Sequence, residues 1–148
     1  MTKKKDYINT IENFLRKYVT YKANIKNCKR QLNYLFPNIT ANYEFDARSG
    51  NSFMISTTEK FAIDRIESKR ALDLHEQIAK SQTVVESIET ALEALEPREK
   101  VFVELRYFKC LPFSQISNAM DQSERSLFQI RNQVTGKLCI SLANLLTL

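Results

Sequence analysis

The stretch PFSQISNAMDQSERSLFQIRNQVTGKL, residues 112–138, contains the pattern that decides the fold of this chain. Apolar residues recur at helical spacing on both sides of a short polar break at Asp121 and Gln122, and Ser123 suits the N-cap of the second helix. The apolar residues that flank the break are Ile116, Met120, Leu127 and Ile130. Two short helices that cross steeply need interlocked apolar residues, and they leave the outer face of the second helix free to enter a major groove. The stretch therefore predicts a helix-turn-helix, with Asp121 where glycine is usual, because aspartate tolerates positive φ better than most residues.

The second helix of this motif is expected over about residues 123–138, and its outer face is the candidate base-reading surface. The residues predicted to read bases are Arg125, Ser126, Phe128, Gln129 and Asn132. Arg125 can give two hydrogen bonds to guanine, and Gln129 or Asn132 can do the same for adenine. Phe128 has three possible roles at this stage, which are contact with a thymine methyl, packing on a neighbouring protein, or packing back on its own domain.

Five further side chains around the motif are candidates for contact with DNA phosphates. They are Ser114, Gln115, Ser123, Arg131 and Lys137. Such contacts would add affinity and salt dependence, but they carry no sequence information.

The rest of the chain is also expected to be helical, because 148 residues contain only two glycines and three prolines. Apolar residues at steps of three and four predict one long helix over about residues 6–36 and another over about 58–95. Pro37 is expected to end the first helix, followed by a loop over 37–57. The fold class is thus all-α, with a helical N-terminal region, 1–95, and a DNA-binding domain, 96–148.

Charge is distributed unevenly along this sequence, whose net charge is +5. Residues 1–36 carry nine basic and two acidic side chains, whereas residues 57–96 carry five basic and nine acidic ones. The two long helices could therefore pair by charge, either as a hairpin within one chain or as a coiled coil between subunits. Alternatively, the charges are solvated outer faces, because an exposed ion pair contributes under about 1 kcal/mol.

Several classes of protein are disfavoured by the same sequence. The three cysteines are isolated, the N-terminus lacks the apolar run of a signal peptide, and no stretch approaches the roughly 20 apolar residues of a membrane span. Metal-ligand spacing, a phosphate-binding loop and a nucleophile elbow are lacking, and His75 is the single histidine. We therefore expect a cytoplasmic protein that is not an enzyme and needs no cofactor or metal.

Beyond these patterns, the last third of the chain resembles region 4 of the sigma-70 family, which reads the −35 promoter element and touches the RNA polymerase flap. The residues that carry the resemblance are Leu92, Leu95, Pro97, Arg98, Glu99, Lys100, Leu105, Arg106, Tyr107, Phe108, Ile116, Ser123, Leu127, Gln129, Ile130 and Leu138. In that family the positions matching Arg125, Ser126 and Gln129 lie on the base-reading face. Nothing upstream resembles sigma region 2, so the chain is not a complete sigma factor.

With the segment STTEKFAIDR, Ser56 to Arg65, the chain also resembles regulators of the ArpU and RinA type, which activate late genes of phages and prophages. That resemblance implies a transcriptional regulator whose partners are double-stranded DNA and, as a further candidate, RNA polymerase. Because a single module of this kind binds DNA weakly, we also expect a homodimer or a higher oligomer. Two alternatives stay open. One is a phage small terminase subunit that recognises packaging-site DNA, and the other is a sigma-like factor that acts mainly by binding RNA polymerase.

Overall fold

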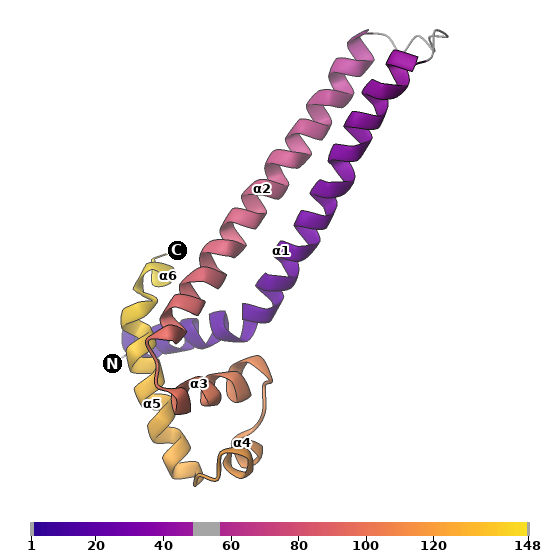
Figure 1. Ribbon diagram of the computed structural model, residues 1–148. Helices are drawn as coiled ribbons and strands as arrows, with labels where there is room; N and C mark the ends of the chain where they lie inside the picture. The colour runs from indigo at the N-terminus through magenta and orange to yellow at the C-terminus, as the bar shows by residue number, and fades with distance from the viewer. Residues whose placement is uncertain (1, 49–56, 148) are drawn as a thin grey trace. The chain divides into compact units, whose positions relative to one another are not determined.

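The computed structural model describes residues 2–48 and 57–147, and within them it is entirely helical, which confirms the all-α prediction. Two long helices precede a group of short ones (Figure 1). The elements are α1 (Thr2–Arg48), α2 (Thr57–Glu93), α3 (Pro97–Val103), the π-helical turn η1 (Glu104–Phe108), α4 (Phe113–Met120), α5 (Glu124–Ser141) and α6 (Ala143–Leu146).

The predicted end of the first helix at Pro37 is wrong. α1 continues through Pro37 to Arg48, so the expected loop over 37–57 is helical in its first part, and residues 49–56 lie outside the described residues. A proline within a helix costs about 3 kcal/mol, because it removes one backbone hydrogen bond and crowds the preceding turn. It does not forbid the helix, since its fixed φ is itself close to the helical value.

The chain divides into two compact units, and the division differs from the predicted boundary at residues 95 and 96. Unit 1 consists of Met1–Lys22 and Gln82–Leu148, and unit 2 consists of residues 23–81. The two helices α4 and α5 therefore share a unit with the start of α1 and the end of α2. A physical reason is size, because a domain of about 50 residues buries so little apolar surface that it is only marginally stable alone.

Unit 1 is built around one apolar core to which both ends of the chain contribute. Its fully buried side chains include Ile11 and Leu15 of α1, Ile88 of α2, Phe102 of α3 and Leu142, which follows α5. α1 is held to its neighbours by two contacts of Tyr18, whose ring stacks on Phe108 at 4.6 Å and whose hydroxyl donates to Glu89 at 2.7 Å. Burial and the Glu89 carboxylate raise the pKa of Tyr18 to about 12. The first 22 residues are thus a structural part of unit 1.

The helix that begins at Pro97 changes type before it ends. It is α-helical to Val103 and then widens into the π-helical turn η1, after which Cys110 adopts the left-handed region with φ of 54°. Within this turn Tyr107 is fully buried, and Phe108 packs on the core. Simple α-helical periodicity does not predict such a turn, because it inserts an extra residue.

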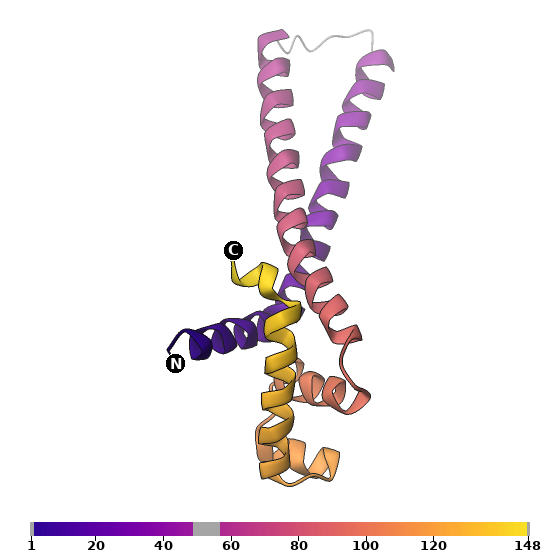
Figure 2. The same ribbon diagram turned by 90° about the vertical axis from the view of Figure 1, so that its left-hand side faces the viewer.

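Unit 2 is an antiparallel hairpin formed by residues of α1 and α2 from the same chain (Figures 1 and 2). Its small core contains Cys28, Leu32 and Ile78, and Asn24 donates a hydrogen bond of 2.9 Å to Ser81. Between residues 23–35 of α1 and the described part of α2, no ion pair is found. In this structure the long helices pair within one chain, through apolar side chains and the hydrogen bond of Asn24.

Truncating a core side chain of α1 tests whether the chain's start belongs to unit 1. We expect Leu15→Ala to lower the free energy of unfolding by about 2–5 kcal/mol, because Leu15 is fully buried and its loss leaves a cavity. Val19→Ala, four residues on in the same helix, is the matched control, since Val19 is 53% exposed and its loss should cost under about 0.5 kcal/mol. Urea denaturation measures the free energy of unfolding of both variants. If Leu15→Ala lowered it as little as Val19→Ala does, the start of α1 would not belong to the core of unit 1.

Candidate nucleic-acid interface

α4, the turn and α5 form a helix-turn-helix at the positions that the sequence predicts. Asp121 ends α4 in the left-handed region, with φ of 54° and ψ of 45°. Ser117 closes the turn by donating its hydroxyl hydrogen to the carbonyl of Gln122. Ser123 is the N-cap of α5, since its Oγ accepts a hydrogen bond of 3.2 Å from the backbone N–H of Ser126. The turn chemistry expected of Asp121 and Ser123 is thus confirmed.

The inner face of α5 is anchored in the core of unit 1. Leu127, Ile130, Val134 and Leu138 are each at most 2% exposed, as the spacing of these residues predicts. Ile116 of α4 is fully buried against them. Because four successive turns of α5 are packed in this way, the opposite side of the helix is fixed toward solvent.

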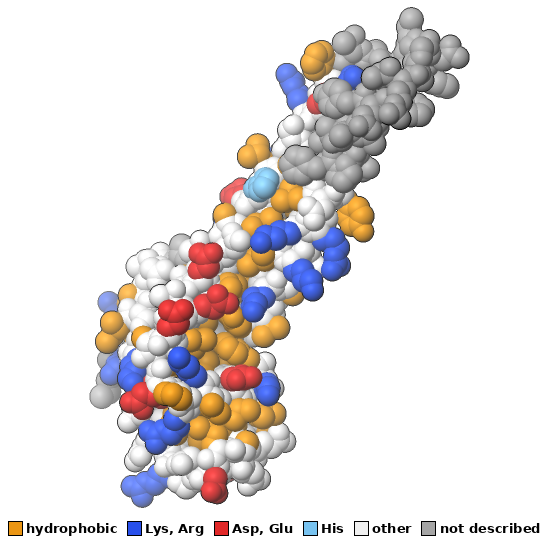
Figure 3. Space-filling view, viewed as in Figure 1, with side chains coloured by type: hydrophobic (Ala, Val, Ile, Leu, Met, Phe, Trp, Pro, Cys, Tyr) orange, Lys and Arg blue, Asp and Glu red, His pale blue; other side chains and the backbone are white. Residues whose placement is uncertain are grey.

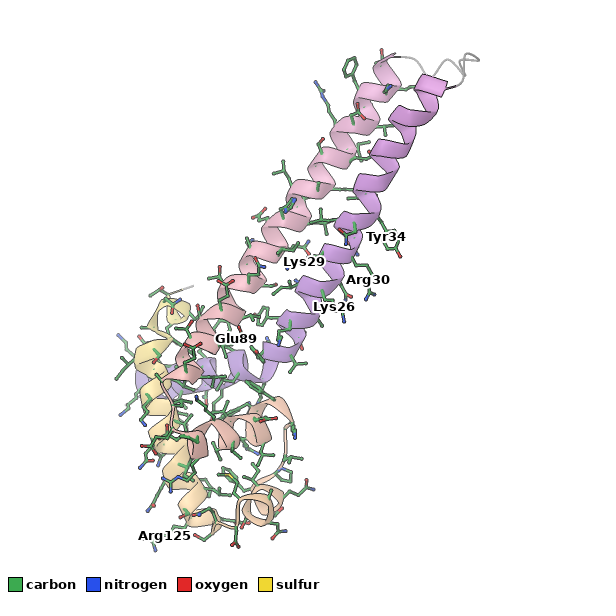
Figure 4. All side chains as sticks on the ribbon, viewed as in Figure 1. Lys26, Lys29, Arg30, Tyr34, Glu89 and Arg125 are labelled. Carbon is green, nitrogen blue, oxygen red and sulfur yellow. The ribbon has the colours of Figure 1, made fainter. Side chains whose placement is uncertain are left out.

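Three of the predicted base readers share the outer face of α5. Arg125, Gln129 and Asn132 are exposed and lie four and three residues apart, so they form one row along the helix. Within the described residues their side chains make no hydrogen bond or ion pair, and Arg125 projects outward from the start of α5 (Figure 4). Their donors and acceptors are free for a ligand.

The other two predicted base readers are placed differently. The ring of Phe128 stacks on Phe113 of α4, with centroids 4.7 Å apart, although Phe128 stays 49% exposed. Of the three possible roles of Phe128, the structure shows packing on its own domain. Ser126 is half-buried, and its backbone N–H serves the N-cap, so it lies beside the row rather than on it.

Two of the predicted phosphate contacts, Arg131 and Lys137, form ion pairs with carboxylates inside unit 1. Arg131 Nε lies 2.8 Å from Glu12 Oε1, and Lys137 Nζ lies 2.8 Å from Glu99 Oε1. The carboxylates of Glu12 and Glu99 are 7% and 1% exposed, so each needs a cation to offset the cost of its burial. The predicted contacts Ser114 and Gln115 are exposed on α4, whereas Ser123 is occupied as the N-cap.

Glu12 is the centre of a buried polar cluster that joins three elements. Its Oε1 accepts hydrogen bonds from Arg131 of α5 at 2.8 Å and from Tyr107 of η1 at 2.8 Å. Burial acts to raise the pKa of Glu12, but the two hydrogen bonds and the charges of Arg131 and Arg16 outweigh it, so the pKa lies below its ordinary value. Burial, together with the charge and the hydrogen bond of Glu12, raises the pKa of Tyr107, although Arg131 acts in the opposite direction. Glu12 is therefore ionised in the folded protein at neutral pH.

Sequence reasoning missed this cluster, although one signal was present. Glu12 lies next to Ile11 and three residues before Leu15, which places a carboxylate at the margin of the apolar face of α1. Its partners are 95 and 119 residues away, and no local pattern specifies such a pairing. Arg131 could have been suspected because it is next to the buried Ile130.

Comparison with known proteins finds no matching family model, no matching curated protein and no matching solved structure. In the described residues, no group of three or more His, Cys, Asp or Glu side chains is arranged to hold a metal ion. No described helix combines the length and the apolar character that crossing a bilayer requires.

Replacing Glu12 by glutamine tests the charge at the centre of the cluster. The folded pKa of Glu12 is below its ordinary value of 4.5, so its carboxylate stabilises the fold above about pH 4.5 and loses this effect as the pH falls through the folded pKa. We expect Glu12→Gln to cost about 1–2 kcal/mol at pH 7, and the difference from the wild type to shrink in acid.

Urea denaturation at neutral pH and below pH 4.5 measures both expectations. Glu86→Gln is the matched control, because Glu86 is exposed on α2 and its side chain makes no hydrogen bond or ion pair with the described residues. A Glu12→Gln cost that is independent of pH would show that the carboxylate charge does not stabilise the fold.

Proposed function

We propose that this chain is a sequence-specific DNA-binding transcriptional regulator that inserts α5 into the major groove. The observation that carries the proposal is the row Arg125, Gln129 and Asn132, which is exposed and free of partners on a helix whose opposite side is buried. Arg125 suits guanine, and the two amides suit adenine, with about 1–3 kcal/mol of discrimination for each good pair. Ser114 and Gln115 would position the domain on phosphates, and Phe128 would support the row through its stack on Phe113.

The proposal includes an assembly and a setting. A single helix-turn-helix reads few base pairs, so we propose a homodimer that binds two half-sites. The resemblance to sigma region 4 and to ArpU- and RinA-type regulators supports activation of phage or prophage late genes in the bacterial cytoplasm. In this proposal the chain carries no catalytic site and needs no cofactor.

A titration against a library of duplexes at two salt concentrations tests the base-reading role. We expect the wild type to select one sequence, and Arg125→Ala combined with Gln129→Ala to lower that preference at least about tenfold, because two base contacts are lost. Weak salt-sensitive binding should remain, since the other phosphate contacts are intact.

Arg65→Ala combined with Gln31→Ala is the matched control, because it removes one cation and one amide from exposed positions in unit 2. It should keep the preference. If the wild type and both variants bind all duplexes alike, α5 does not read bases, and a sigma-like factor that binds RNA polymerase becomes the better description. Selection confined to packaging-site DNA, by a large ring-shaped oligomer, would instead indicate a small terminase subunit.

A further inference from the structure

The middle of α1 has an unusual excess of positive charge. Between Glu12 and Glu44 the sequence contains six lysines and arginines but no aspartate or glutamate. Three of these cations, Lys26, Lys29 and Arg30, lie in the part of α1 that belongs to unit 2. We call these three residues the basic face. Lys and Arg side chains gather along this stretch of α1 in Figure 3, and the three residues are labelled in Figure 4.

The basic face is exposed and is not neutralised by the chain itself. Lys29 and Arg30 follow Lys26 by three and four residues, so the three side chains project from one side of the helix. Cys28 and Leu32 instead pack into the hairpin core. Within the described residues none of the three forms an ion pair. The ion pair of α2 in this unit, Lys80 with Glu76, is internal to α2.

Such an arrangement costs stability, because like charges one turn apart repel each other by about 0.2–0.5 kcal/mol a pair. An anionic ligand that spans more than one turn would remove this repulsion. Tyr34 follows one turn beyond Arg30 and is 70% exposed, so its ring and hydroxyl are available to the same ligand. Basic side chains and a tyrosine hydroxyl are among the groups that contact DNA phosphates.

The helix-turn-helix needs an additional source of affinity for DNA. α5 carries three cations, but Arg131 and Lys137 are engaged with buried carboxylates, which leaves Arg125. Glu124 is next to Arg125 and Asp121 lies in the turn, so the reading surface has little net positive charge of its own. Neutralisation of phosphates supplies much of the affinity of most DNA-binding proteins.

We propose that the basic face of α1 is a second, sequence-independent contact with the phosphates of double-stranded DNA. This inference rests on the proposed function for its ligand. It assigns affinity and salt dependence to unit 2, and sequence preference to unit 1. An acidic protein surface, such as the acidic face of α2 in a second copy, is the competing partner.

The test compares two triple variants of the full-length protein. Lys26→Gln, Lys29→Gln and Arg30→Gln remove the basic face, whereas Arg65→Gln, Lys69→Gln and Arg70→Gln remove three exposed cations of α2 in the same unit. Both variants change the net charge equally, but the α2 cations are interleaved with Asp64, Glu67 and Asp73. Affinity is measured over a series of salt concentrations, for a duplex several helical turns long that carries the selected site and for one of scrambled sequence.

Loss of the basic face is expected to weaken binding to both duplexes about tenfold or more. It should also reduce the slope of log affinity against log salt by about 2–3, because each phosphate contact contributes about 0.9. The ratio of the affinities for the two duplexes should be unchanged. The α2 variant should lose less than half as much affinity and slope as the variant of the basic face. Circular dichroism measures helical content and so identifies a variant that fails to fold. If the triple variant of the basic face fails to fold, the single variant Lys26→Gln replaces it, and the slope of log affinity against log salt should then change by about 1.

Equal effects of the two triple variants on affinity and slope would overturn the proposal. The proposal would also be overturned if loss of the basic face produced a smaller oligomer whose affinity for DNA per subunit is unchanged, because the basic face would then bind another copy of the chain. The two proposals fail separately. A wild type that binds both duplexes equally, yet loses affinity and slope with the basic face, would refute base reading by α5 while supporting this contact.

Discussion

A carboxylate that is nearly withdrawn from water sets the constraint on which unit 1 depends. Glu12 is 7% exposed, and an ion in such a position must be matched by hydrogen-bond donors or its burial becomes unfavourable. Arg131 and Tyr107 supply those donors from α5 and η1. The cluster can form only when the start of the chain lies against its last third. The second buried carboxylate, Glu99, repeats the arrangement with Lys137 at the far end of α5.

These two pairs explain why α5 presents the face that it does. Arg131 and Lys137 are directed to carboxylates within unit 1, and the apolar residues of α5 fill the core. What remains outside is a short polar row that is rich in hydrogen-bonding groups and poor in charge. In the proposed function this row supplies selectivity. Affinity then has to come from elsewhere, and the basic face of α1 is a surface whose cations form no ion pair with the described residues.

The sequence was sufficient wherever local spacing decides the structure. Periodicity placed Leu127, Ile130, Val134 and Leu138 inside, and cap chemistry placed Ser123 at the start of α5. It was insufficient wherever residues distant in sequence decide the structure. Arg131 resembles a phosphate contact until Glu12, 119 residues earlier, is brought beside it. Pro37 shows a different limit, because a local preference of a few kcal/mol yields when the rest of a long helix favours continuation.

The two ends of the chain form one unit, and in the proposed function this unit presents the outer face of α5 to DNA. Amide hydrogen exchange of the full-length protein, with and without a duplex carrying the selected site, measures both properties. In the free protein, we expect the amides around Leu15 in α1 and those around Val134 in α5 to exchange with similar opening free energies. On addition of DNA, the gain in protection should include residues 124–132 of α5. Independent exchange of the two segments would show that they do not form one unit, and protection confined to the long helices would show that α5 does not bind the duplex.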